Sequence, residues 1–179
     1  MIAMTFEKTN LEGILLVRPT VFEDKRGYFF ESFNADTFNR AGITDNFVQD
    51  NQSMSDKGVL RGLHFQRDPY GQGKLVRVLQ GSVLDVAVDI RKNSPTYGMH
   101  YKHILSAENK LMLWIPTGFA HGFLTLEDKT VFFYKCTSFY NKASEAAIRW
   151  NDPTLAIEWG IATPIVSEKD AQAPLFNNS

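Results

Sequence analysis

Short stretches of alternating hydrophobic and polar residues, separated by turn residues, run along most of this chain. Alternation with a period of two is typical of β-strands that bury one face. The strands expected from this pattern cover residues 14–18, 27–33, 47–52, 59–66, 74–80, 82–90, 99–106, 112–115, 121–126, 130–138 and 146–150. The stretch "KLVRVLQGSVLDVAVDI" also suggests an antiparallel hairpin that turns at Gln80 and Gly81.

Two short helices are expected beside these strands. Asn34 is a suitable N-cap for a helix that carries Asp36 in its first turn and ends before Gly42. Ser167 is a suitable N-cap for a second helix, and Asp170 follows it at the spacing of a capping box. Because many strands follow one another without regular strand–helix alternation, the expected fold class is all-β: an antiparallel sandwich or barrel with a few short helices.

Length and charge narrow the possible functions. The 179 residues suit a single domain spanning 1–179. The formal net charge of −1 gives no overall attraction to nucleic acid or to a membrane, so an anionic ligand needs a local basic cluster. Cys136 is the only cysteine, which fits a reducing compartment. The N-terminal run "GILLV" is too short for a signal peptide or a membrane span, and a cytoplasmic location is expected.

Several polar residues occupy strand positions where a sandwich core needs apolar ones. In "GVLRGLHFQRD", Arg61 and His64 differ by an odd step, so a regular strand sends them to opposite faces. A bulge at Gly62 brings both to one cavity; otherwise Arg61 faces solvent. Tyr134 has the parity of Phe132, which directs it inward, either as a reactive group or as a buried tyrosine with a satisfied hydroxyl.

Other motifs are weaker when each is taken alone. The charged turn before Phe29 offers Arg26 for a phosphate beside a ring for stacking, or is simply an exposed strand end. Gln49 and Asn51 share a face at an i, i+2 spacing. His121 ends a P-x-G-x-x-H pattern that resembles the second motif of metal-binding cupins. No His-x-His pair accompanies it, so no metal site is expected.

Together these motifs resemble one family. The blocks "DKRGYFFESF", "FVQDNQS", "GVLRGLHFQ", "KLVRVLQGSVLDVAVDIR", "SAENKLMLWIPTGFAHGF", "FFYKCTSFYN", "IRWNDPTLAIEW" and "SEKDA" follow one another as in the dTDP-4-dehydrorhamnose 3,5-epimerase family, from about residue 6 to residue 176. The resemblance implies a cupin-type jelly roll. It also implies the activity of the enzyme that precedes the final reductase in dTDP-L-rhamnose synthesis.

The resemblance further implies a role for each matching residue. His64 matches the general base, Asp170 its charge partner, Tyr134 the proton donor and Lys74 the cation beside the enolate. Contacts to a dTDP-linked 4-keto-6-deoxy sugar are implied for Arg26, Phe29, Glu31, Gln49, Asn51, Arg61, His121, Tyr140, Glu145 and Lys169. The segment with Arg26 and Phe29 is expected to cross to the other subunit of a homodimer, and no cofactor is implied. Ser167 and Asp170 also fit a plain helix cap.

The chemistry accounts for this residue set. Protons at C3 and C5 of a 4-keto sugar are acidic because their loss gives an enolate, and inversion needs a base on one face and an acid on the other. Three alternatives are left open: an epimerase acting at C3 or C5 alone, a 3,4-ketoisomerase, and a non-catalytic cupin that binds nucleotide sugars. The presence of His64, Tyr134 and Asp170 together argues against the last.

Overall fold

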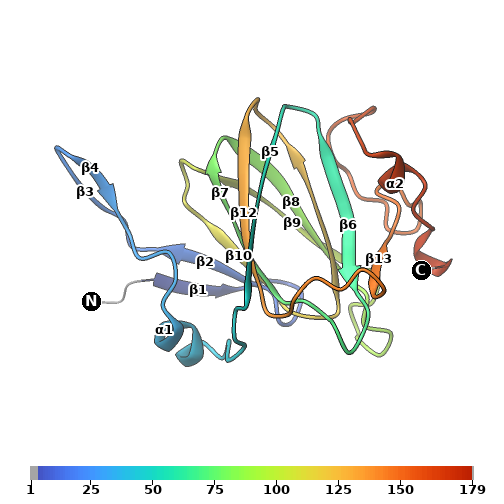
Figure 1. Cartoon of the computed structure of the whole chain (residues 1–179), viewed down its shortest axis with the longest axis horizontal. Coiled ribbons are helices and arrows are strands. Elements are labelled where there is room, and N and C mark those ends of the chain that lie inside the picture. The colour runs from blue at the N-terminus through green and yellow to red at the C-terminus, as the bar shows by residue number, and fades with distance from the viewer. Residues whose placement is uncertain (1–3, 179) are drawn as a thin grey trace.

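The computed structural model describes residues 4–178, which form an antiparallel β-sandwich with short helices (Figure 1). The elements in chain order are β1 (Met4–Lys8), β2 (Leu15–Pro19), β3 (Phe22–Asp24), β4 (Gly27–Phe29), α1 (Ala35–Arg40), β5 (Gln49–Ser55), β6 (Leu60–Gln66), β7 (Lys74–Gln80), β8 (Ser82–Asp89), β9 (His100–Ser106), β10 (Met112–Ile115), β11 (Phe119–Thr125), β12 (Thr130–Cys136), β13 (Glu145–Ala147), α2 (Glu168–Ala171) and a 3₁₀ turn (Phe176–Asn178). The expected all-β class is confirmed.

Two sheets make up the sandwich. The first has the strand order β1-β2-β10-β7-β12-β5 and the second the order β13-β6-β11-β8-β9. The strands β3 and β4 pair only with each other and form a hairpin, residues 22–29, which we call the arm. The arm extends away from the sandwich on the side of the N-terminus (Figure 1).

The main core lies between the sheets and follows from the alternation. On β7 the inward residues Val76 and Val78 are buried, and on β8 Val83 and Ala87 meet them from the other sheet. Burial of such apolar side chains is the main favourable contribution to folding. The C-terminal segment covers the outer face of the second sheet, where Trp159 is buried.

The prediction of an antiparallel hairpin that turns at Gln80 and Gly81 is wrong. β7 belongs to the first sheet and β8 to the second, so the chain crosses between sheets at Gly81 instead of pairing the two strands. Gly81 has φ +76°, and a Cβ there would collide with Oγ1 of Thr130. A glycine permits this tight corner, and both strands then direct apolar residues into the same core.

The ends of the chain also differ in detail from the expectation. Only Gly27–Phe29 of the expected strand 27–33 is a strand, and β1 and β3 were not expected. Both expected helix caps are confirmed: Asn34 accepts from the backbone N–H of Thr37, and Ser167 accepts from that of Asp170. Within residues 4–178 no helix is long and apolar enough to cross a membrane.

Candidate active site

A cavity of about 170 Å³ lies between the two sheets and collects most of the polar residues that do not suit a core. The first sheet contributes residues from β5, β7 and β12, and the second contributes residues from β6 and β11. The lining residues are Asn51, Gln52, Ser53, Lys74 and Tyr134 from the first sheet, and Arg61, His64, His121, Gly122 and Phe123 from the second.

The bulge expected at Gly62 is present and explains why Arg61 and His64 share this cavity. The register pairs Arg61 with Phe123 but His64 with His121, so two residues of β6 face one of β11. Gly62 has φ +134°, and a Cβ there would collide with the facing backbone of Gly122. The extra residue reverses the parity after Arg61, which brings both side chains to the cavity, although Arg61 stays exposed.

His64 is held by a buried carboxylate. Its Nε2 lies 2.6 Å from Oδ1 of Asp170, which is 3% exposed, and the N–H of Gly62 donates to Oδ2 at 3.4 Å. Burial alone raises the pKa of the Asp170 carboxyl, but the hydrogen bonds that the carboxylate accepts, the one from His64 first among them, outweigh it and hold that pKa below its ordinary value. An ionised carboxylate only accepts, so Nε2 carries the hydrogen and Nδ1 keeps a lone pair.

The structure at α2 shows that the helix cap and the contact to His64 use different groups. The Oγ of Ser167 caps the helix by accepting from the Asp170 backbone N–H at 3.1 Å, while the Asp170 carboxylate is directed to His64. The helix cap therefore positions the carboxylate and does not compete for it.

Tyr134 and Lys74 line the same cavity from the opposite sheet. Burial is the main cause that raises the pKa of the Tyr134 hydroxyl, so the group keeps its proton at neutral pH. Burial also lowers the pKa of Lys74, although the nearby groups Cys136 and Asp85 partly offset the effect. The Lys74 Nζ lies 5.9 Å from the centre of the Tyr134 ring.

A row of amide side chains leads from Tyr134 to the segment after β12, which together with Glu145 and Lys169 we call the rim. Asn51 is the cross-strand partner of Tyr134 on β5, and its side chain donates to Sγ of Cys136 at 3.6 Å. Gln49 donates to Oδ1 of Asn51 at 3.0 Å and accepts from the backbone N–H of Tyr140 at 2.8 Å. The expected shared face of Gln49 and Asn51 is therefore confirmed.

His121 is joined to a residue that the sequence reasoning missed. Its Nε2 lies 2.9 Å from Oδ2 of Asp85, and both residues are buried. Asp85 has the same parity on β8 as the inward residues Val83 and Ala87, which was the available signal. In residues 4–178 no group of three or more His, Cys, Asp or Glu side chains is placed to hold a metal ion.

The rim beside His64 carries three more of the expected residues. Tyr140 donates from its hydroxyl to Oε2 of Glu145 at 3.1 Å, and the same oxygen lies 2.5 Å from Nζ of Lys169. The hydrogen bond from Lys169 is the largest cause that holds the pKa of Glu145 below its ordinary value. These contacts link the segment after β12 to α2, next to Asp170.

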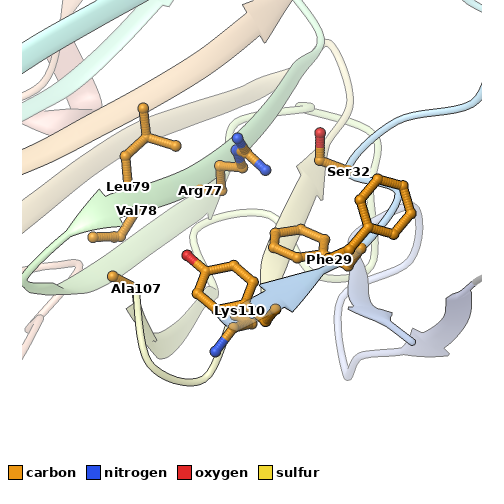
Figure 2. Close-up of a pocket in the computed structure, with 9 residues that line it drawn as sticks. Phe29, Ser32, Arg77, Val78, Leu79, Ala107 and Lys110 are labelled. Atoms are coloured by element: carbon orange, nitrogen blue, oxygen red, sulfur yellow. The ribbon is translucent and has the colours of Figure 1, made fainter. Parts of the chain in front are cut away.

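Seven of the ten expected contact residues do not line the cavity, and three of these seven lie on the arm or just after it. Arg26 is at the tip of the arm, paired with Asp24, and Phe29 is 70% exposed. Glu31 accepts from the side chain of Asn34. A separate hollow of about 260 Å³ is lined by Phe29, Arg77 and Lys110 among others, and His64 is not part of its lining. Figure 2 shows these side chains around the hollow.

An imidazole on one sheet, held by a carboxylate, and a protonated tyrosine hydroxyl on the other sheet form an arrangement that suits an acid/base enzyme built in an antiparallel sandwich. The family profile "dTDP-4-dehydrorhamnose 3,5-epimerase" matches residues 8–178. The dTDP-4-dehydrorhamnose 3,5-epimerase of Shigella flexneri is 53% identical over 174 residues, 97% of this chain and 96% of the relative.

Two solved structures agree with this match. The dTDP-4-dehydrorhamnose 3,5-epimerase of Elizabethkingia anophelis has a TM-score of 0.94 at 51% identity, over 98% of both chains. The dTDP-6-deoxy-D-glucose-3,5-epimerase of Legionella pneumophila, in complex with dTDP-4-keto-L-rhamnose, has a TM-score of 0.94 at 50% identity, over 97% of this chain and 93% of that one. The chain belongs to the dTDP-4-dehydrorhamnose 3,5-epimerase family, and its activity is that family's isomerase reaction in dTDP-L-rhamnose biosynthesis.

Proposed function

We propose that His64 and Tyr134 are the base and the acid that invert C3 and C5 of dTDP-4-dehydro-6-deoxy-D-glucose to give dTDP-4-dehydro-L-rhamnose. The observation that carries this proposal is their placement on opposite sheets across one cavity. Inversion requires a proton to leave from one face of the carbon and to return on the other. A base and an acid on opposite walls meet that requirement.

His64 removes the proton through Nδ1, the ring nitrogen that Asp170 leaves free. The imidazolium formed is stabilised by the Asp170 carboxylate, which has its charge at neutral pH because its pKa is held low. The electron pair of the broken C–H bond moves onto the C4 oxygen as an enolate.

Lys74 stabilises the enolate. It is a buried cation beside Tyr134, and a preorganised charge is most effective where water is excluded. Tyr134 then gives its proton to the carbon from the first sheet's side, and its raised pKa keeps it protonated until that step. His121, held by Asp85, and Arg61 complete the polar wall on the side of the second sheet.

The nucleotide is bound by the rim and by the arm of a second subunit. Arg26 has a guanidinium that suits a diphosphate, and Phe29 offers a flat apolar ring for thymine, yet neither reaches the cavity of its own chain. In the proposed homodimer the arm delivers both residues, with Glu31, to the partner's site. Gln49, Asn51, Tyr140, Glu145 and Lys169 contact the nucleotide sugar from the chain that holds His64.

Solvent proton exchange tests the proposal. The protein is incubated with dTDP-4-keto-6-deoxy-D-glucose in heavy water, the product is trapped by reduction, and deuterium is located by mass and NMR. Label with inverted configuration at both C3 and C5 is expected, and label at one carbon alone would identify a mono-epimerase.

Variants then test the assigned groups. His64→Asn and Tyr134→Phe are expected to stop product formation, whereas the matched changes His103→Asn on β9 and Tyr97→Phe are expected to leave it intact. Normal epimerisation by both His64→Asn and Tyr134→Phe would show that the base and acid are assigned wrongly.

A further inference from the structure

The segment Phe139–Asn141 follows β12, the strand of the cavity residue Tyr134, and has no regular secondary structure. It carries two exposed aromatic side chains, Phe139 and Tyr140. Loops that lack strand or helix bonding are usually mobile unless other groups satisfy their backbone. Here side-chain amides from two strands hold the backbone of all three residues.

Gln66, at the end of β6, makes most of these bonds. It is 9% exposed, and its Oε1 accepts from the N–H of Asn141 at 2.7 Å. Its Nε2 donates to the carbonyl of Phe139 at 3.2 Å and to that of Tyr70 at 2.6 Å. A buried glutamine with both N–H groups and an acceptor position used has a defined orientation, so it holds its partners in a defined place.

Gln66 and its two carbonyl partners belong to the three chain segments that carry the proposed reacting groups. Gln66 is two residues after His64 on the same strand, Tyr70 lies in the loop that leads to Lys74, and Phe139 follows the strand of Tyr134. Gln66 therefore ties the segments of the base, the cation and the acid together at one end of the cavity.

The rim tyrosine between the two Gln66 bonds is fixed from further sides. Its backbone N–H donates to Gln49 on the first sheet, and its hydroxyl donates to Glu145 on the second. Without Gln66, the backbone on both sides of Tyr140 loses its side-chain partner, and only the bonds to Gln49 and Glu145 still position the ring.

We propose that Gln66 is a positioning residue that sets the Phe139–Asn141 segment, and through it the Tyr140 ring, to receive the nucleotide part of the substrate. This inference rests on the proposed function, in which Tyr140 contacts the nucleotide sugar. Gln66 itself does not touch the reacting carbons, so it acts on substrate binding and leaves the proton transfers unchanged.

The test is a steady-state comparison of KM and kcat with dTDP-4-keto-6-deoxy-D-glucose. Gln66→Met has a similar length but no hydrogen-bonding groups, and it is expected to raise KM about tenfold, the change that losing a bond or two of ordinary net strength gives, with kcat within about twofold. Gln66→Glu is expected to raise KM as well, because its second oxygen faces two carbonyl oxygens. It also supplies the test should the methionine variant not fold.

Asn109→Leu is the matched control. Asn109 also makes three bonds to a loop backbone, to Ser106, Leu111 and Ile104, but in the turn between β9 and β10. Its loss is expected to lower the melting temperature and to leave KM unchanged. An unchanged KM in both Gln66 variants, or a fall in kcat alone, would overturn the inference and leave Gln66 with a structural role.

A double-mutant cycle with Tyr140→Ala separates this inference from the proposed function. Tyr140→Ala is expected to raise KM, and Gln66→Met is expected to add little in that background because both act through the same ring. Additive effects would overturn the inference alone. An unchanged KM in Tyr140→Ala would overturn the proposed nucleotide contact, and the inference with it.

Discussion

Replacing Asp170 with asparagine tests whether the negative charge of Asp170 stabilises the imidazolium form of His64. The change keeps the shape of the side chain but removes the negative charge, which lies in a hydrogen bond of 2.6 Å. A hydrogen bond to a charged group is worth about 1.5–3 kcal/mol. Asp170 is 3% exposed but the His64 side chain is 36% exposed, so solvent screens the pair only in part and about 2–3 kcal/mol is expected.

That energy is lost when the imidazolium forms, so kcat is expected to fall about 30- to 150-fold with KM within about threefold. An amide that turns its N–H₂ toward Nε2 also moves the ring hydrogen to Nδ1, which deepens the loss. The assay is product formation trapped by reduction. Glu168→Gln on the same helix removes an exposed carboxylate and should have no effect. A kcat of Asp170→Asn within threefold of the parent enzyme would refute the reasoning.

Three further predictions concern the same cavity. Burial lowers the pKa of Lys74 and raises that of Tyr134, so kcat/KM should decline as the pH rises through a value below lysine's usual 10.4. Lys74→Arg should flatten that decline between pH 8 and 10. An identical decline in the parent enzyme and in Lys74→Arg would contradict this prediction. Tyr134→Phe should lower product formation about 10²-fold or more. In heavy water the recovered substrate should still gain deuterium without inversion, because His64 returns a proton to the face that it left. NMR of the recovered substrate would show this label. Gly62→Ala should lower the free energy of unfolding by about 3 kcal/mol, because the added Cβ collides with β11. Gly160→Ala should lower it by only about 1–2 kcal/mol, because Gly160 also has a positive φ but has open space around it. Equal losses for the two variants in urea titrations would be evidence against the collision.

The pattern of apolar residues predicted strands well where the strand is largely buried. The expected strands 74–80 and 112–115 coincide with β7 and β10 at both ends. The arm strand β3, with all three residues exposed, has no buried face to produce such a pattern. Alternation also does not tell which sheet a strand joins, and that is why Gly81 was taken for a hairpin turn.

Part of the site followed from parity and part did not. Parity directed Tyr134 inward and placed Gln49 and Asn51 on one face, and the glycine in β6 marked the bulge that brings His64 to the cavity. The Asp85 carboxylate was overlooked because its strand is otherwise a strongly apolar run. Gln66 was overlooked because its partners are backbone groups of a distant loop, which no side-chain pattern encodes.

The placement of the proposed base and acid on facing sheets has a kinetic consequence. On the proposed mechanism one pair of groups serves two carbons on either side of C4, so the sugar must present C3 and C5 in turn. Before the second inversion His64 must pass its proton to solvent and Tyr134 must take one up. After the first inversion the singly inverted sugar is either released or stays bound and undergoes the second inversion. A cavity of about 170 Å³ with a hydrogen-bonded rim favours retention. The rim thereby governs the commitment of the intermediate, and a looser rim would release singly inverted sugar into solution.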